Sequence, residues 1–345
     1  MTSKELVYQT LSFSNTTGYV PKQLWYLPWA DIYYPADLKK LLDDFHWDIT
    51  TAPCDYSHPP RKEGDPYRRG DYIDEWGCHF HNIQDGVHGE VKKPIVEDDE
   101  WHDVSNVHIP EEMLTFSVDA VNRFCYNNDS FIMAGVTPRP FEQLQFIRGS
   151  ENLFIDLFDP PDRMMEFIRH MHDLYCRLLE KWAKTDVDAL GLMDDWGSQT
   201  SLLINPALWR EIFMPLYRDY INIAKAYKKK VFMHSDGYTL SIIPYLIELG
   251  LDAFNTQIFC IGVEKLAQFR GKLTFWGEMD RQYILTRGTL DEVDAAVDLV
   301  FNTLWANGGC IAQCEFGPMG KPENVRRVFE RWKQKRSLGH PYVEL

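Results

Sequence analysis

The sequence predicts an α/β barrel of parallel strands with a functional site at one rim. Two observations lead to this fold class. Short apolar runs alternate with helical segments between residues 231 and 317, a pattern typical of βα units with parallel strands. Each run also ends in polar side chains, and in such barrels the carboxyl ends of the strands meet at the face that carries the active site. The sequence therefore favours an enzyme.

Four strands with polar tips define this rim. Each is expected to end in groups that bind a ligand or a metal ion. The tips are His234-Ser235-Asp236-Gly237 after 231–233, Asn255-Thr256-Gln257 after 252–254, Gly277-Glu278-Met279-Asp280 after 273–276, and Cys314-Glu315-Phe316-Gly317 after 310–313.

Composition narrows the class of protein. The 345 residues are 45% hydrophobic and 25% charged, ordinary values for a globular chain. A net charge of −15 argues against a nucleic-acid partner, because phosphate binding needs clustered basic residues. No apolar run is long enough to span a bilayer, and no signal peptide follows Met1. We expect a soluble, cytoplasmic protein with no membrane partner. The seven cysteines are scattered, so a disulfide framework is not expected.

Residues 1–345 are expected to form one domain with an elaborated N-terminal part. Residues 1–60 are rich in aromatic side chains, which either cover the barrel bottom, form a homodimer surface or wall a ligand pocket. Residues 61–112 predict a β-hairpin insertion, with a strand over 72–80 and an Asp85-Gly86 turn.

The main βα units are expected within residues 113–335. A helix is predicted over 111–127, followed by a strand over 131–136. A long helix is predicted after Asp159-Pro160-Pro161, with Asp as N-cap and an apolar stripe at spacings of three and four. A strand over 187–193 then ends in Asp194-Asp195.

The strand tips contain a candidate zinc site. His234, Asp236, Glu278 and Cys314 offer nitrogen, oxygen and sulfur ligands, the set that Zn²⁺ takes in tetrahedral geometry. Three protein ligands with one open position are typical of a catalytic zinc. Each residue also has a simpler interpretation: a strand-end hydrogen bond, a helix cap, an ion pair with Arg281, or packing.

Other candidates come from the same rim and from the N-terminal region. Of the adjacent Asp194 and Asp195, one is expected to face the rim while the other caps a helix. The catalytic candidates are Asp48, Asp194, Gln257 and Glu278. The aromatic residues expected to wall the substrate are Trp25, Trp29, Tyr33, Trp196 and Trp276.

The chain resembles the uroporphyrinogen decarboxylase superfamily. The resemblance rests on segments 134–138, 188–190, 236–237, 276–280, 311–313 and 322–325, together with Gly317. It implies a (β/α)8, or TIM, barrel, and 47–49 resembles the segment that holds the decarboxylases' essential Asp. Those enzymes bind their substrate's carboxylates with an arginine-rich N-terminal loop, whereas 22–29 contains no arginine.

The resemblance is closer to the superfamily's zinc-dependent methyltransferases, which work with corrinoid proteins. His234 matches the histidine of their His-x-Cys pattern, Asp236 stands where its cysteine would be, and Cys314 lies at or beside the distant cysteine. This implies methyl transfer between a small methylated compound and the corrinoid of a partner protein. Two alternatives remain: a metal-independent, decarboxylase-like lyase using Asp48 or Asp194, and a ligand-binding barrel without catalysis.

Overall fold

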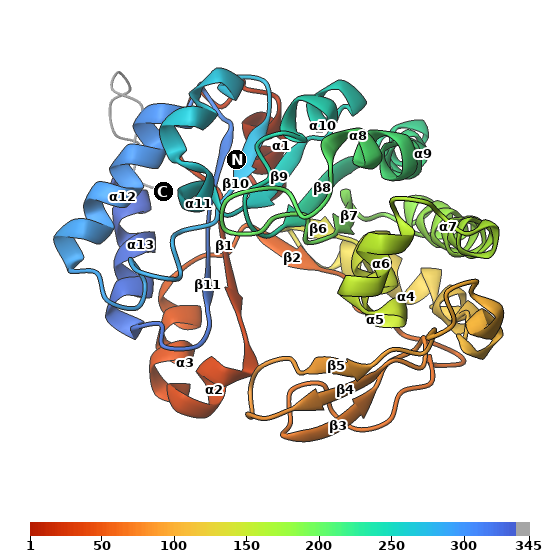
Figure 1. Cartoon of the computed structure of the whole chain (residues 1–345). Coiled ribbons are helices and arrows are strands. Elements are labelled where there is room, and N and C mark those ends of the chain that lie inside the picture. Colours follow the sequence, from red (N-terminus) through yellow and green to blue (C-terminus); the bar gives the residue numbers. More distant parts are fainter. Residues whose placement is uncertain (336–345) are drawn as a thin grey trace.

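The computed structural model of the protein describes residues 1–335, and its centre is a nearly closed barrel of eight parallel strands (Figure 1). The barrel strands are β1 (Lys22–Tyr26), β2 (Ile49–Thr51), β6 (Phe131–Met133), β7 (Ala189–Met193), β8 (Lys230–Ser235), β9 (Ala253–Thr256), β10 (Thr274–Trp276) and β11 (Cys310–Phe316). Their order is β1-β11-β10-β9-β8-β7-β6-β2. The predicted barrel is therefore confirmed.

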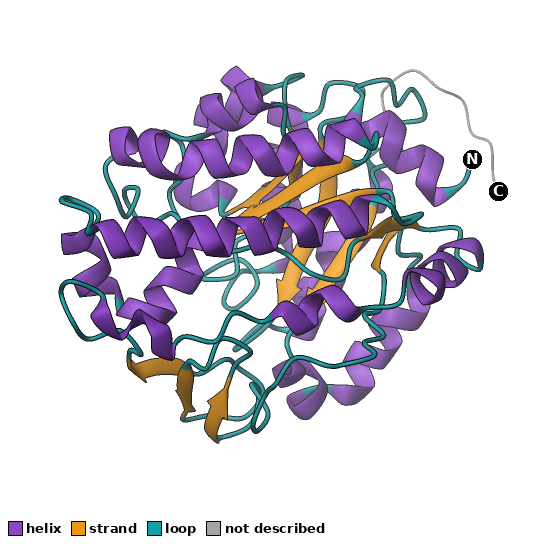
Figure 2. Ribbon diagram, turned by 90° about the vertical axis from the view of Figure 1, so that its right-hand side faces the viewer, coloured by secondary structure: helices purple, strands orange, loops and turns teal. Residues whose placement is uncertain are grey.

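Helices surround this barrel and link its strands, with the longest lying across its outer face (Figure 2). They are α1 (Ser3–Leu11), α2 (Pro28–Tyr33), α3 (Pro35–Asp44), α4 (Val118–Tyr126), α5 (Pro140–Arg148), α6 (Ser150–Asp156), α7 (Asp162–Ala183), α8 (Pro206–Leu208), α9 (Met214–Ala226), α10 (Ile243–Leu249), α11 (Ile258–Ile261), α12 (Leu290–Leu304) and α13 (Pro322–Gln334). Within residues 1–335, no helix has both the length and the apolar character that crossing a membrane requires.

Side chains of the barrel strands alternate between two packed layers, because successive residues of a strand point to opposite faces. One buried cluster fills the barrel interior and is closed by Val7 and Leu11 of α1; its strand members include Phe131, Phe232, Trp276 and Ile311. The larger cluster lies between the strands and the outer helices and includes Met233 and Cys314. This alternation decides which strand-end residues reach the site.

Aspartates fix the amino-terminal end of the barrel. Asp48, Asp188 and Asp252 each accept a hydrogen bond from the backbone N–H of a neighbouring strand, at Lys22, Ile132 and Val231, over 2.8–2.9 Å. The backbone N–H of Asp48 also donates to the Lys22 carbonyl, which ties β2 to β1 where the barrel closes. These carboxylates stabilise the end of the barrel opposite the predicted site.

The insertion is a three-stranded antiparallel sheet, β3 (Gly70–Ile73), β4 (His79–Asn82) and β5 (Glu90–Lys93). The single strand predicted over 72–80 is wrong. The Asp74 carboxylate accepts hydrogen bonds from the backbone N–H groups of Trp76 and Cys78, and this turn separates β3 from β4. Short-range side-chain to backbone bonds of this kind compete with strand pairing.

Two helix boundaries also differ from the prediction. The segment 111–127 is a short 3₁₀ helix followed by α4, because the Ser117 hydroxyl caps the N-terminus of α4 by accepting from the Ala120 N–H. Helix α7 starts at Asp162 with Pro161 as N-cap, not at Asp159. Its predicted apolar stripe is buried, as expected.

Candidate metal centre at the barrel mouth

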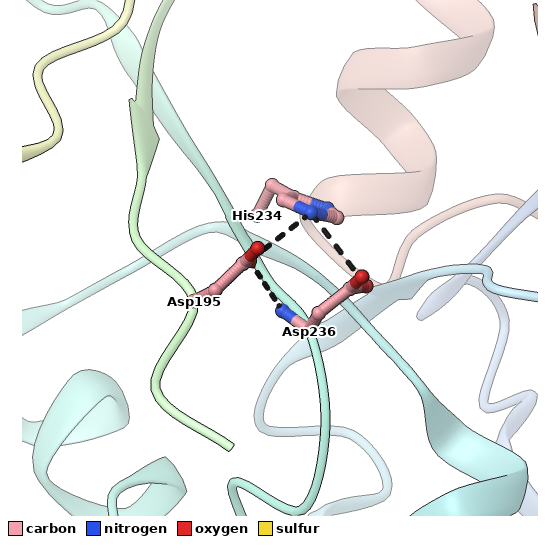
Figure 3. Close-up of side chains that lie close together, drawn as sticks. All are labelled: Asp195, His234 and Asp236. Carbon is pink, nitrogen blue, oxygen red and sulfur yellow. Dashed lines mark hydrogen bonds and ion pairs between the residues drawn. The ribbon is translucent and has the colours of Figure 1, made fainter. Parts of the chain in front are cut away.

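Three side chains converge at the carboxyl ends of β7 and β8: Asp195, His234 and Asp236 (Figure 3). The parallel register pairs Met193 with His234, so the residues that follow the two strands lie side by side. His234 Nε2 lies 3.5 Å from Asp195 Oδ1 and 3.7 Å from Asp236 Oδ1. One ligand atom from each residue lies within 4.8 Å of the others. This group has the size and chemistry to hold a metal ion.

The other ring nitrogen of His234 is fixed by β9. His234 Nδ1 lies 2.7 Å from Asn255 Oδ1, and the Asn255 amide nitrogen donates to the Trp276 carbonyl and to Gln313 Oε1. Because the amide nitrogen is committed to two acceptors, Oδ1 must accept from a protonated Nδ1. The lone pair of His234 therefore lies on Nε2, which faces the two aspartates, as in metal sites whose histidine is oriented by a second partner.

The two oxygens of Asp236 differ in their surroundings. Oδ2 pairs with Arg281, whereas Oδ1 is buried and has no hydrogen-bond partner within residues 1–335. A buried carboxylate oxygen without a partner is costly. The Asp236 backbone N–H donates to Asp195 Oδ1 over 2.9 Å, which holds the two carboxylates together. A cation between Asp236 Oδ1 and His234 Nε2 would satisfy the unpartnered oxygen.

Arg281 joins the cluster to two further acids. Its guanidinium lies 3.1 Å from Glu315 and 3.5 Å from Glu278. Burial raises the pKa of Glu278 well above its usual range; Arg281 opposes this shift, and Asp236, Glu315 and Asp195 add to it. The arrangement therefore favours a protonated Glu278 beside the ion pair of Arg281 with Asp236.

Two glycines bring the aspartate-bearing loops into contact. A Cβ atom on Gly237 would lie 2.1 Å from the Gly197 carbonyl oxygen, and one on Gly197 would lie 2.3 Å from the Tyr238 nitrogen. Gly237 also has a φ of +80°, which L side chains rarely adopt. Any side chain at Gly237 would separate the loop that carries Asp195 from the loop that carries Asp236.

A pocket of ≈ 140 Å³ lies beside these acids, lined by residues that include Gln199, Gln257, Cys260, Glu278 and Arg281. Gln257 and Glu278, both catalytic candidates, therefore share one cavity next to the metal group. The indole of Trp25 approaches the same place from β1, with its ring 5.4 Å from that of His234 and 4.9 Å from that of Trp276. Of the predicted aromatic wall, Trp25 packs against His234 of the metal group, and Trp276 packs against Trp25 and Phe232 in the barrel interior.

Cys314 is not part of this group. On β11, Ile311 and Gln313 face the barrel interior, whereas Cys314 packs in the layer between strands and helices and is fully buried there. Because neighbouring residues of a strand alternate, the inward position belongs to Glu315, which reaches the cluster through Arg281. The residue of β11 that faces the site is therefore Glu315, one position after the predicted ligand Cys314, and the thiol does not belong to the ligand set.

Both aspartates with predicted catalytic roles lie in structural positions. Asp48 sits at the amino-terminal end of the barrel. Asp194 is fully buried and accepts hydrogen bonds from the N–H groups of Phe141 and Glu142 and from the Tyr217 hydroxyl, which fix the start of α5. Its neighbour Asp195 is the one that faces the mouth.

The side chains of the remaining aromatic candidates pack in other parts of the molecule. Trp196 is buried against Phe141 in the outer layer, with ring centroids 4.0 Å apart. Trp29 packs against Tyr33 and Phe316, and Tyr33 is 52% exposed. These residues support the fold or cover its surface.

Comparison with known proteins places the chain in a family. A family model described as uroporphyrinogen decarboxylase (URO-D) matches residues 73–334. The chain belongs to the uroporphyrinogen decarboxylase family. The match begins in the insertion and runs through β11 into α13, so it covers Asp195, His234 and Asp236. No curated protein matches the sequence significantly.

Among solved structures, the fold is similar to that of a methyltransferase from Methanosarcina mazei. The TM-score is 0.65 at 13% sequence identity, over 97% of this chain and 99% of the other. An endo-β-1,4-xylanase from Gloeophyllum trabeum is similar over 93% of this chain, with a TM-score of 0.45 and 9% identity. At 13% identity the likeness to the methyltransferase shows the barrel fold, and function rests on the site itself.

Proposed function

We propose that this protein is a metal-dependent methyltransferase that moves a methyl group between a small methylated compound and the corrinoid of a partner protein. The observation that carries the proposal is the convergence of His234 Nε2, Asp195 and Asp236 at the barrel mouth. The family and the fold shared with an archaeal methyltransferase agree with this reaction class.

The residues present fit a divalent cation. His234 offers a free Nε2 that Asn255 keeps oriented, and Asp236 offers a buried oxygen with no other partner within residues 1–335. Imidazole and carboxylate are both zinc ligands, and three of them leave a fourth position for substrate. Without a thiolate the set is harder than that of a thiol-rich zinc site, so Mn²⁺ and Co²⁺ are competing ions.

When bound, the cation would act as a Lewis acid on the oxygen or nitrogen that carries the methyl group. The residues of the chain supply the rest of the site. Trp25 places an aromatic ring beside His234, which favours an apolar methyl donor. Glu278 lines the pocket, and its raised pKa favours the protonated carboxyl. It can therefore give its proton to the oxygen or nitrogen that loses the methyl group.

A decarboxylase-like reaction has less support. It would need Asp48 or Asp194 at the substrate. Asp48 instead closes the opposite end of the barrel, and the Asp194 carboxylate accepts hydrogen bonds from α5 and α9. The acids around Arg281 would also repel a substrate with several carboxylates.

The test is methyl transfer to cob(I)alamin, followed by the change in its absorbance. The purified protein is loaded with Zn²⁺ and supplied with methoxyarenes or methylamines as donors. Turnover is expected with the loaded protein and loss of at least about 100-fold with His234→Ala, as expected when a group on which the chemistry depends is removed. Full turnover in protein stripped of metal would overturn the proposal.

A further inference from the structure

Arg281 is the common ion-pair partner of three carboxylates at the barrel mouth. Its Nη2 pairs with Asp236 Oδ2, and its Nη1 lies 3.1 Å from Glu315 Oε1 and 3.5 Å from Glu278 Oε1. The three acids come from the carboxyl ends of three different strands, β8, β10 and β11. In the part of the chain that the structure describes, no other arginine or lysine pairs with any of them. The guanidinium therefore stands where the three carboxylates converge.

Asp236 uses its two oxygens in different directions. Oδ2 pairs with Arg281, while Oδ1 lies 3.7 Å from His234 Nε2 and is buried without a hydrogen-bond partner among residues 1–335 (Figure 3). In sites with two metal ions, the ions lie about 3.5–4 Å apart, a spacing that one carboxylate spans when each of its oxygens binds one ion. Asp236 has this bridging arrangement, with a guanidinium in place of the second ion.

The backbone that carries Arg281 is fixed by the residue before it. Asp280 Oδ1 accepts hydrogen bonds from the backbone N–H groups of Gln282 and Tyr283, over 2.7 and 3.0 Å. The Asp280 carbonyl also accepts from the Leu285 N–H over 2.9 Å. Arg281 lies inside this turn, and a guanidinium keeps its proton in proteins. The turn therefore holds a permanent positive charge against the three acids.

The Arg281 side chain lines two cavities. One has a volume of ≈ 140 Å³ and also contains Glu278 in its lining; the other has a volume of ≈ 50 Å³ and also contains Glu315. Both are larger than the roughly 10–15 Å³ that one water molecule needs. Truncation of Arg281 should therefore leave the three carboxylates around a space with room for an ion and its water ligands.

We propose that Arg281 takes the place of a second cation and so restricts the site to one divalent metal ion, bound by Asp195, His234 and Asp236. Without the guanidinium, Asp236 Oδ2, Glu278 and Glu315 would offer three oxygen ligands, a set that suits Mn²⁺. The inference rests on the metal group of the proposed function. It deepens that function by fixing its chemistry as that of one Lewis-acidic ion and not of a two-metal clamp.

The experiment counts Mn²⁺ ions bound by the full chain in wild type, Arg281→Ala and Arg281→Lys. Calorimetric titration and elemental analysis give the number of ions, and circular dichroism confirms folding. One ion per chain is expected for wild type and for Arg281→Lys, which keeps a positive charge beside the acids. Two ions are expected for Arg281→Ala, because the three carboxylates lose their cation and gain space. Arg281→Ser repeats the test with a second small side chain should Arg281→Ala not fold.

Electron paramagnetic resonance of the Mn²⁺-loaded proteins gives a readout that a general loss of packing would not produce. Two ions bridged by the Asp236 carboxylate are magnetically coupled, whereas the single ion of wild type is not. The double variant Arg281→Ala, Glu315→Gln should return to one uncoupled ion, because the second position loses a charged ligand.

Arg327→Ala is the matched control for the loss of an arginine. Its side chain is 30% accessible, against 28% for Arg281, and it pairs with Asp294 through two hydrogen bonds between α13 and α12. This variant should bind one ion, as wild type does. Two ions in wild type or in Arg281→Lys, or one ion in folded Arg281→Ala or Arg281→Ser, would overturn the inference.

The same data separate this inference from the proposed function. Wild type that binds no ion would remove the metal group, and with it the proposed reaction. One ion in wild type and one in folded Arg281→Ala would remove the inference about Arg281 alone. The expected ion counts without any methyl transfer to cob(I)alamin would leave the role of Arg281 standing and remove the reaction.

Discussion

His234 Nδ1 donates to Asn255 Oδ1 over 2.7 Å, so a residue of β9 determines which nitrogen of a β8 histidine is free. The amide itself is held by Trp276 and Gln313 from the next two strands. Three strands therefore cooperate to present one lone pair to Asp195 and Asp236. Such outer partners commonly control both the orientation and the basicity of a metal-binding imidazole.

Asn255→Ala should weaken Zn²⁺ binding by roughly 10- to 100-fold while leaving all three ligands in place. The imidazole would lose its anchor and rotate, and Nε2 would carry the proton in part of the population. Calorimetric titration with Zn²⁺ measures the effect. Thr274→Val is the matched control, since it removes a buried hydroxyl that has no hydrogen-bond partner within residues 1–335. Equal affinities in the wild type and Asn255→Ala would show that the hydrogen bond has no role in the site.

Gly237→Ala should abolish metal binding by displacing the backbone, although all three ligand side chains remain in the sequence. The new Cβ would meet the Gly197 carbonyl at 2.1 Å, and the positive φ adds strain of roughly 1–3 kcal/mol. Gly262→Ala is a matched control, because Gly262 also has a positive φ, +95°, but the nearest atom to a Cβ there, on the Lys265 side chain, lies at an ordinary contact distance of 3.7 Å. Metal titration and thermal unfolding of both variants distinguish loop displacement from general strain. Normal metal binding in Gly237→Ala would contradict the role of this contact.

Glu278 should make the protein less stable as pH rises. Its pKa is raised in the folded state, chiefly by burial, so the folded chain binds more protons than the unfolded chain between the ordinary carboxyl pKa and the raised value. The free energy of unfolding therefore falls with pH across that window. Glu278→Gln should remove this component, so the variant gains stability relative to wild type as pH increases.

Urea unfolding of metal-free protein at several pH values measures this difference, with the exposed Glu180→Gln as control. A difference between Glu278→Gln and wild type that does not change with pH would show that Glu278 is ionised in the folded protein throughout. In that case Glu278 could not serve as a proton donor.

Cys314→Ala should leave metal binding unchanged and lower stability by roughly 1–2 kcal/mol, the cost of a small cavity in a packed layer. The reason is its place between strands and helices, where the thiol packs as an apolar group. Metal content after dialysis and urea unfolding give the two values. Loss of bound metal in a folded Cys314→Ala protein would show that the Cys314 thiol is a metal ligand after all.

The sequence predicted the barrel correctly because the apolar runs and helices of the second half alternate without interruption. It also predicted that residues 234 and 236 share a rim, since both follow one strand and lie on one face. Asp195 comes beside them because β7 and β8 pair in a register that sets Met193 against His234, 41 residues further along the chain. A single sequence carries no signal for that pairing.

The misplacement of Cys314 has a simple physical cause. Residues 310–316 all lie in one strand, and every member of that strand except Glu315 is buried, so burial alone does not tell the inward from the outward set. A shift of one residue exchanges the two faces. The polar Gln313 and Glu315, spaced by two, were the signal that could have identified the inward face. The turn at Asp74 was missed for a related reason, because it lies inside the run 72–80, whose composition is typical of a single strand.

The central claim is that Asp195, His234 and Asp236 bind one divalent cation, and metal titration of four proteins tests it most directly. Calorimetry and elemental analysis of wild type, Asp195→Asn, His234→Ala and Asp236→Asn are compared under identical conditions, with circular dichroism to confirm folding. One Zn²⁺ per chain is expected for wild type, with affinity reduced by at least about 100-fold in each folded variant, since each loses one of three ligands. Wild type that binds no divalent cation, or binds it equally well without the His234 imidazole, would contradict the account.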